Sequence, residues 1–242
     1  MKTSHLFENQ LEEKIKKAKK WMESVKEFMH INSKIKYEIK IENDLPTFYV
    51  DSNITIVKKF LNIGNGYYEL PFPFGDVAGD FTVLSHDEML GTFNYFPVTI
   101  GGTCDVSRCR ISEFGRINSV GELNVSFCPI ASWKGLPSQI GTLNVVGTKI
   151  KSFSGISKEL IRCSLLIFNP IEITSGALDL LAVDELEEVK ADLNTFSATK
   201  SIFKRAEKLE EIINEHLASG KRDIFAMQAD LIDNDLETWA TR

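Results

Sequence analysis

The sequence predicts an α+β repeat protein: a short leucine-rich-repeat-like parallel β solenoid, with about 20 residues per coil and helical N- and C-terminal caps. Two observations predict it. Strand-like triplets return at nearly constant spacing through the middle of the chain, and long helical patterns lie at its two ends. We therefore divide the 242 residues into an N-terminal helix and β-hairpin cap (1–60), a solenoid (61–183) and a C-terminal helical cap (184–242).

The N-terminal cap begins with one predicted helix over residues 5–30. Its apolar side chains recur at steps of three and four, at Leu11, Ile15, Ala18, Met22, Val25 and Met29. Residues 35–41 then alternate apolar and charged side chains, which indicates a half-buried strand. The turn at Asn43–Pro46 and a second strand from Thr47 to Val50 predict a hairpin.

The solenoid is predicted from columns of residues that stay in register. The strand triplets begin 20, 23, 19, 20 and 20 residues apart, at Leu61, Phe81, Cys104, Leu123, Leu143 and Cys163. Two further columns keep the same step, one of isoleucines (Ile111, Ile130, Ile150) and one of aromatic residues (Phe114, Trp133, Phe153). A single short coil cannot bury its inner face, so neighbouring coils must stack. We expect Leu123 and Leu143 to lie directly over each other in the interior.

The C-terminal cap is predicted to be helical. One apolar stripe runs through Ile202, Ala206, Leu209, Ile213 and Leu217. Ser197 and Thr199 are alternative N-caps and Gly220 ends the helix, before a shorter helix from Asp223 to Ile232.

The segment 170–196 remains open in the sequence. Leu178–Leu180 is a candidate strand, and residues 186–193 fit either a strand or a short helix.

Composition excludes several classes of protein. The formal net charge of −6 argues against general nucleic-acid binding, and the basic run from Lys14 to Lys20 is flanked by Glu12, Glu13 and Glu23, as on a solvated helix face. No apolar run approaches the ~20 residues of a membrane span. The charged N-terminus lacks the apolar segment of a secretory signal. We therefore expect a cytoplasmic protein that does not bind membranes.

No catalytic or metal-binding set is expected. The four cysteines, Cys104, Cys109, Cys128 and Cys163, fit no zinc-ligand spacing, so we interpret them as structural thiols of a reducing compartment.

The other chemistry-bearing residues point the same way. The histidines His5, His30, His86 and His216 are scattered, and His86 lies near Asp87 and Glu88 only in a degenerate repeat. Gly64–Gly66 and Gly101–Gly102 lack a phosphate-binding context and are expected to be turns. The sequence predicts no enzyme and no cofactor.

Several segments resemble a known family. They are Gly79–Val83, Cys104–Cys109, Gly135–Gly141, the lead-in Leu70–Phe81 and the helical tail Glu215–Asp233. They are similar to the repeats, opening and tail of the leucine-rich-repeat-like proteins encoded by tailed bacteriophages, over roughly residues 35–240. The resemblance implies the solenoid architecture and a phage-encoded protein acting in the host cytoplasm. It implies no particular activity.

A candidate binding face follows from the repeat. The outward slot between inward strand residues is polar in every coil, at Asn62, Thr82, Asp105, Asn124, Asn144 and Ser164. The slot before the Cys/Thr column holds Arg108, Phe127 and Gly147, where the phage family has an Asn-Asn pair. A solvated sheet surface explains the polar column as well as a binding face does. A rigid platform carrying an outward Phe127 beside Arg108 favours binding.

The main hypothesis is a non-enzymatic protein-binding repeat protein that acts on a protein of the bacterial host, for example as a counter-defence inhibitor. Its candidate binding residues are Asp105, Arg108, Asn124, Phe127 and Asn144.

Two alternatives stay open. One is a phage structural or assembly protein that self-associates through its helical caps, with Leu209, Ile213 and Leu217 as the interface. The other is a nucleic-acid-associated protein that uses the N-terminal lysines. The oligomeric state and the partner's identity are not determined by the sequence.

Overall fold

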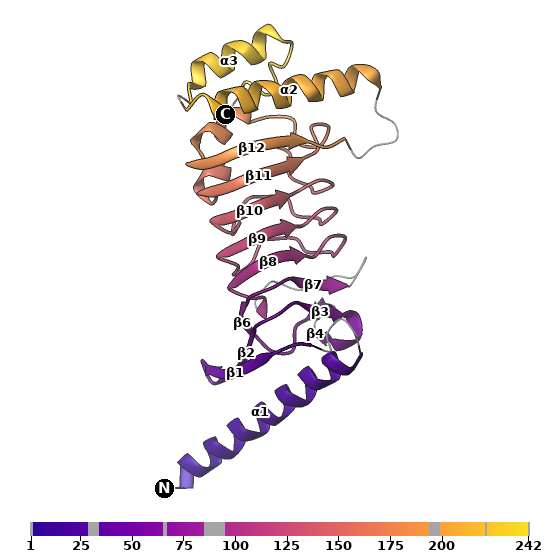
Figure 1. The fold of residues 1–242 in the computed structure, drawn as a ribbon, viewed down its shortest axis with the longest axis vertical. Coiled ribbons are helices and arrows are strands. Elements are labelled where there is room, and N and C mark those ends of the chain that lie inside the picture. Colours follow the sequence, from indigo (N-terminus) through magenta and orange to yellow (C-terminus); the bar gives the residue numbers. More distant parts are fainter. Residues whose placement is uncertain are drawn as a thin grey trace.

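The computed structural model describes residues 2–28, 34–64, 67–84, 95–193, 199–220 and 222–241. It is an elongated stack of coils whose strands lie one above another, with helices at both ends (Figure 1). The predicted parallel β solenoid is confirmed, with about six turns of roughly 23 residues each.

The described residues form one main sheet of ten strands. Its path runs β1-β2-β6-β8-β9-β10-β11-β12, and β3 and β7 pair beside this path. The bounds are β1 Tyr37–Glu42, β2 Leu45–Val50, β3 Ile54–Val57, β6 Phe74–Val77, β7 Phe81–Leu84, β8 Thr99–Asp105, β9 Ser119–Asn124, β10 Gln139–Asn144, β11 Arg162–Phe168 and β12 Glu185–Ala191. Strands β1 and β2 form the predicted antiparallel hairpin, and the pairs from β2 to β12 are parallel.

The middle coils confirm the predicted stacking. Leu123 and Leu143 are paired across β9 and β10, and both side chains are fully buried. Cys104 lies in the same column on β8. The aromatic column is also interior, since the Trp133 and Phe153 rings stack with centroids 6.0 Å apart. Apolar stacking between neighbouring coils therefore supplies the core.

One triplet is misplaced by the sequence alignment. Cys163 pairs with Ile140, and Leu166 takes the position opposite Leu143 that was predicted for Cys163. The coil between β10 and β11 is three residues longer than the preceding one, and it contains the 3₁₀ turn η4 (Ile156–Lys158). The extra residues move the strand start without disturbing the core columns.

The first triplet is also wrong. Ile54 and Ile56 of β3 pair with Phe81 and Val83, so β3 occupies the place predicted for Leu61. The chain from Leu61 instead enters β4 (Asn62–Gly64), which pairs antiparallel with β5 (Tyr67–Glu69) in a separate small sheet. A 3₁₀ turn, η2 (Lys58–Phe60), connects β3 to β4.

The open segment 170–196 extends the solenoid. The candidate strand Leu178–Leu180 is instead part of the 3₁₀ helix η5 (Ala177–Ala182). The buried residues of η5 are Ala177, Leu178, Leu180 and Leu181, which is not the alternation of a strand. Of the two structures that fit residues 186–193, the strand forms: β12 pairs with β11 along its whole length. The sheet thus continues beyond the predicted limit at residue 183.

Gly101 and Gly102 form a bulge in β8 and not the predicted turn. Ile100 pairs with Val120 and Cys104 with Leu123, so β8 has one residue more than β9 over the same span. A Cβ atom on Gly102 would lie 2.2 Å from the Asp80 carboxylate, which explains why glycine stands there. Gly64 lies in β4, and residues 65 and 66 lie outside the described residues.

The N-terminal cap is α1 (Lys2–Phe28) and the hairpin. Ala18, Met22 and Val25 are fully buried, as the apolar stripe predicts, whereas Leu11 and Ile15 are half-buried. Met29 and His30 lie outside the described residues. The N-terminal part of α1 extends past β1, beyond the end of the solenoid (Figure 1).

The C-terminal cap is α2 (Lys200–Ala218), which lies along β12, and α3 (Ile224–Asp233) above it (Figure 1). Leu209, Ile213 and Leu217 are buried beneath α2 within the same chain. These three side chains are therefore not available for the self-association predicted for them.

The predicted ends of the C-terminal helices are mostly confirmed. Gly220 adopts φ 65° after α2, and the Asp223 carboxylate accepts hydrogen bonds from two amides in the first turn of α3. Thr199 occupies the N-cap of α2 but makes no capping bond, and Ser197 lies outside the described residues.

Candidate functional site

The three middle coils leave their strands through the same turn. Asp105, Asn124 and Asn144 each end a strand, and each side-chain oxygen accepts a hydrogen bond from the amide two residues later, at 2.9, 3.2 and 3.1 Å. All three side chains are half-buried. Such side chains mimic a backbone turn and fix its geometry. These predicted binding residues therefore hold the turns in shape.

The Cys/Thr column satisfies backbone carbonyl groups, in its own turn or in the preceding coil. The Cys109 and Cys128 thiols donate to carbonyl groups of the preceding coil, and the Thr148 hydroxyl donates within its own turn at 2.8 Å. Burial raises the pKa of Cys128 and of Cys163 to about 12, and it also raises the pKa of Cys104. These thiols stay protonated at neutral pH and are poor nucleophiles.

The turns bring Arg108, Phe127 and Gly147 into one column at the surface, which we call the turn ridge. Their φ angles are 59°, 60° and 76°, all in the left-handed region. Glycine adopts this region freely, whereas other residues lose roughly 1–2 kcal/mol there. Only Gly147 avoids that loss, so Arg108 and Phe127 are held in an unfavourable backbone conformation.

The neighbours of Phe127 hold its ring in place. A Cβ atom on Gly147 would lie 2.4 Å from the ring, so only glycine leaves space for it. From the coil on the other side, the Arg108 guanidinium lies 5.7 Å from the ring centroid, in a cation–π contact. The Phe127 side chain nevertheless remains 45% exposed. The result is an aromatic ring presented at the surface beside an arginine.

The predicted polar column is shorter than expected. Thr82 pairs with Asp105, and Asn124 with Asn144 on the next coils. Asn62 lies in the small separate sheet. In β11, Ile167 and not Ser164 stands opposite Asn144. The outward polar column therefore stops at β10.

A set of acidic residues was missed by the sequence analysis. The carboxylates of Glu159, Glu172 and Asp179 accept hydrogen bonds from the amides of Gly135, Gly147 and Gly155, at 3.1, 2.7 and 2.9 Å. Each acid stands 24 or 25 residues after a glycine of positive φ. An acidic residue at this spacing from a turn glycine, slightly longer than one coil, was the sequence signal that could have predicted these hydrogen bonds. Glu172 thereby fixes the Gly147 end of the turn ridge.

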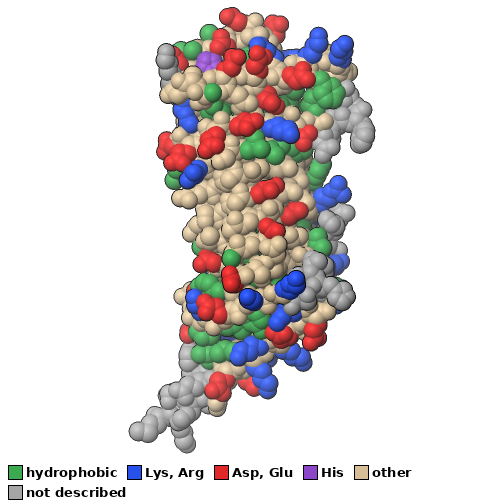
Figure 2. Space-filling view, viewed as in Figure 1, with side chains coloured by type: hydrophobic (Ala, Val, Ile, Leu, Met, Phe, Trp, Pro, Cys, Tyr) green, Lys and Arg blue, Asp and Glu red, His purple; other side chains and the backbone are tan. Residues whose placement is uncertain are grey.

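The strand face beside the ridge is flat. A Cβ atom on Gly141 would lie 2.3 Å from the Gly121 carbonyl oxygen, and one on Gly121 would lie 2.8 Å from the Gly101 oxygen. This close approach requires the glycine in each coil. Figure 2 shows the middle of this face as mainly backbone and uncharged polar side chains, with a few acidic groups. In these middle coils, the turn ridge is where an exposed large apolar side chain, Phe127, contacts an arginine, Arg108.

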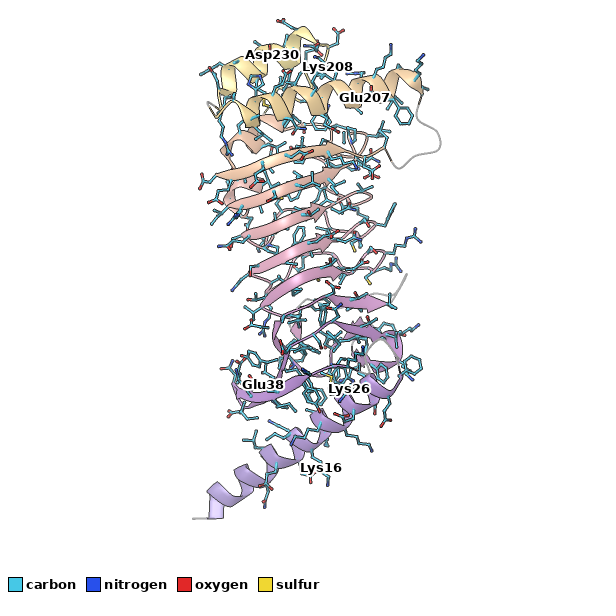
Figure 3. All side chains as sticks on the ribbon, in the orientation of Figure 1. Lys16, Lys26, Glu38, Glu207, Lys208 and Asp230 are labelled. Carbon is cyan, nitrogen blue, oxygen red and sulfur yellow. The ribbon has the colours of Figure 1, made fainter. Side chains whose placement is uncertain are left out.

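The part of the chain that the structure describes contains no cluster of three or more metal-ligating side chains. No helix among those residues is long and apolar enough to cross a membrane. His86, Asp87 and Glu88 lie outside the described residues. His216 contacts Asp230 at 2.7 Å and links α2 to α3 (Asp230 is labelled in Figure 3).

No family model, curated protein or solved structure matches this chain. The structure alone therefore assigns the protein to a class, that of parallel β-solenoids.

Proposed function

We propose that this protein is a non-enzymatic binding module that captures another protein on the turn ridge. The observation that carries the proposal is Phe127. Its side chain is 45% exposed although its backbone is held at φ 60°. Glycine adopts this turn position at lower cost, as Gly147 does in the next coil, so an exposed phenylalanine here favours a function for its side chain. Exposed aromatic residues and arginines dominate the binding energy of protein interfaces.

The geometry supports a partner of particular chemistry. The Phe127 ring lies beside Gly147 and under the Arg108 guanidinium, so its position is already favoured before a partner binds. An apolar pocket on the partner would receive the ring, and a carboxylate or carbonyl group beside that pocket would accept from the guanidinium. Asp105, Asn124 and Asn144 support the ridge by fixing its turns.

We further propose that the chain is phage-encoded and that its partner is a protein of the bacterial host, met in the host cytoplasm. The resemblance of the repeats Gly79–Val83 and Cys104–Cys109 to the phage family supports this origin. Inhibition of a host defence protein is the form of activity that we propose for it.

The test is affinity capture from bacterial cells with the full chain as bait, followed by mass spectrometry. Phe127→Gly removes the ring and suits the left-handed backbone, so the fold is retained while specific capture is lost. Arg108→Ala weakens capture by roughly ten-fold or more, the usual effect of truncating a central arginine.

The matched control is Ile161→Ala, which removes an apolar side chain of similar exposure, 49%, away from the ridge. Capture should be unchanged in this variant. Identical captured proteins for the wild-type chain and Phe127→Gly would refute the ridge.

A further inference from the structure

At the β1 end of the main sheet, the outward backbone groups have no partner among the described residues. β1 ends the strand path, and among the described strands it pairs only with β2. The Asp51 amide donates to the Lys36 carbonyl at 2.9 Å, which sets the phase of this antiparallel ladder. Successive residues of a strand point their backbone N–H and C=O groups alternately toward one side and the other. The backbone groups of Tyr37, Ile39 and Ile41 therefore point away from β2.

Two local features agree with this phase. Asn43 and Asp44 both have positive φ, as in a two-residue type I′ hairpin whose flanking residues, Glu42 and Leu45, are hydrogen-bonded to each other. Pro46, which has no N–H to donate, stands opposite Ile41. No contact of the described residues involves the outward N–H and C=O groups of Tyr37, Ile39 or Ile41.

The charges along β1 are complementary to their own reversed order. Lys36, Glu38, Lys40 and Glu42 alternate on one face of the strand. If a second β1 pairs antiparallel about a two-fold axis at Ile39, every lysine opposes a glutamate. Lys36 then faces Glu42, and Glu38 faces Lys40, each twice.

The registers shifted by two residues lack this complementarity. Moving the second strand by two residues in one direction places Lys40 opposite Lys40 and Glu38 opposite Glu42. Moving it in the other direction places Glu38 opposite Glu38 and Lys36 opposite Lys40. Like charges directly opposite each other destabilise a strand pair. The two-fold register at Ile39 also aligns the outward backbone groups of both strands.

An uncovered apolar surface lies at the same end. The buried stripe of α1 becomes only half-buried at Ile15 and Leu11, where the helix extends beyond β1 (Figure 1). Figure 3 labels Lys16 on this stretch and Glu38 on β1. Ile41, on the apolar side of β1, is 41% exposed. A strand added to β1 would extend this apolar side of the sheet.

We propose that β1 pairs antiparallel with β1 of a second copy of this chain, which joins the two sheets in a two-fold dimer. An edge strand whose outward backbone groups lack partners offers a template for pairing with another chain. Several registers oppose the outward backbone groups, and among them the one centred on Ile39 opposes unlike charges along the whole strand, so we expect that register to be selected. The turn ridges lie in the middle of each solenoid and remain free, so the dimer would present two of them.

Charge reversal with the full chain tests the pairing. Wild-type protein should dimerise in sedimentation-velocity experiments over a concentration series. Lys40→Glu places glutamate opposite Glu38 twice, and Glu38→Lys places lysine opposite Lys40 twice, so each variant alone should dimerise about ten-fold or more weakly. A mixture of the two variants restores both opposite-charge pairs, and a heterodimer of near wild-type affinity should form.

The controls separate pairing from folding. Lys134→Glu makes the same charge change on an exposed residue of a middle coil and should leave the dimer intact. Thermal unfolding of each variant reports whether the fold is retained. A wild-type chain that stays monomeric at its highest soluble concentration overturns the proposal. So does a pair of folded variants that dimerise as well as wild type.

Cysteine cross-linking tests the register. Ile39→Cys places a thiol on the two-fold axis, where it can form a disulfide with its copy. Ile41→Cys faces Tyr37 of the second copy and lies too far from its own copy to do so. Disulfide dimers of Ile39→Cys without those of Ile41→Cys support the register, and the opposite pattern refutes it.

Discussion

The two ends of the strand path, β1 and β12, are finished in different ways. Beneath α2, the Asn214 side chain accepts from the Val189 amide at 2.8 Å and donates to the Val189 carbonyl at 2.9 Å. Glu210 accepts from the Ala191 amide at 2.7 Å. At the other end, α1 reaches the hairpin through side-chain contacts, and the outward backbone groups of β1 receive no comparable partner from the described residues.

This difference separates two tasks of a cap: covering the apolar core, and supplying hydrogen-bond partners to the last strand. Both end helices cover apolar core, since each buries an apolar stripe. Only α2 also carries polar side chains of the right length and position to close the strand ladder. Covering a core needs apolar area, whereas closing an edge needs individual hydrogen-bond partners.

The largest expected effect comes from removing the anchor of the closed end. The Trp239 ring packs on Phe153 and Phe168, with centroids 6.1 and 6.0 Å away. Trp239→Ala should lower the free energy of unfolding by about 3–5 kcal/mol, because it leaves a cavity under the C-terminal segment. Denaturant unfolding measures it. A loss below about 1 kcal/mol would show that the cap is held elsewhere.

Asn214→Leu tests the closure of the edge directly. It leaves the amide and carbonyl of Val189 without partners beneath α2, which should lower the free energy of unfolding by about 2–4 kcal/mol. Asn214→Asp keeps the acceptor and loses the donor, so it should cost less. Amide exchange at Val189 should quicken in Asn214→Leu, and much less in Asn214→Asp, whose carboxylate still accepts from that amide. Equal stabilities of Asn214→Leu and the wild type would remove the distinction between the edges.

Glu210→Gln makes a smaller change at the same edge. The amide oxygen can still accept from Ala191, but the bond loses its charge assistance. We expect a loss of about 1 kcal/mol in denaturant unfolding. Glu211→Gln, on an exposed part of the same helix, is the control and should have a smaller effect.

The smallest effect concerns the link between α1 and the open edge. Burial, together with the hydrogen bond that its hydroxyl donates to Glu23, raises the pKa of Tyr37 to about 12 from an ordinary 10.0. The unfolded chain loses this proton near its ordinary pKa, so the stabilisation is complete below pH 10 and disappears between pH 10 and 12.

Wild-type protein should therefore lose more stability than Tyr37→Phe over that pH range. Tyr49, whose pKa is also raised to about 12 by its hydrogen bond to Glu42, is present in both proteins and does not affect the comparison. Parallel pH profiles of the two proteins would show that Tyr37 does not link α1 to β1.

Particular elements show how far the sequence predicts this fold. Leu123 and Leu143 were found by spacing because coils of equal length keep inward residues in register. Cys163 was misplaced because the connection from β10 to β11 is three residues longer than the one before it. A constant 20-residue step therefore aligns Cys163 with Leu143, whereas Leu166 takes that position. Ile54 was missed because its coil is longer: it pairs with Phe81, 27 positions later, well outside the repeat.

The candidate site divides in the same way. Arg108 and Phe127 were recognised as an outward pair from their repeat column, and the structure places them in contact. The role of Asp105, Asn124 and Asn144 as turn acceptors was not predicted, because an outward slot in a strand and a turn-forming side chain have the same sequence signature. The left-handed backbone of Phe127 also needed the structure, since it belongs to a turn that Asn124 fixes through its hydrogen bond to the Ser126 amide.

The sequence by itself determined the solenoid, its stacked interior columns and its helical ends. These follow from the periodic placement of apolar side chains, which is a local and repeated property. Only the tertiary structure decided which residue begins each coil, which edge is closed and which is open, and how Phe127 is held at the surface. Those outcomes depend on hydrogen bonds and close approaches between residues that one coil or more separates along the chain, and no local pattern encodes those partners.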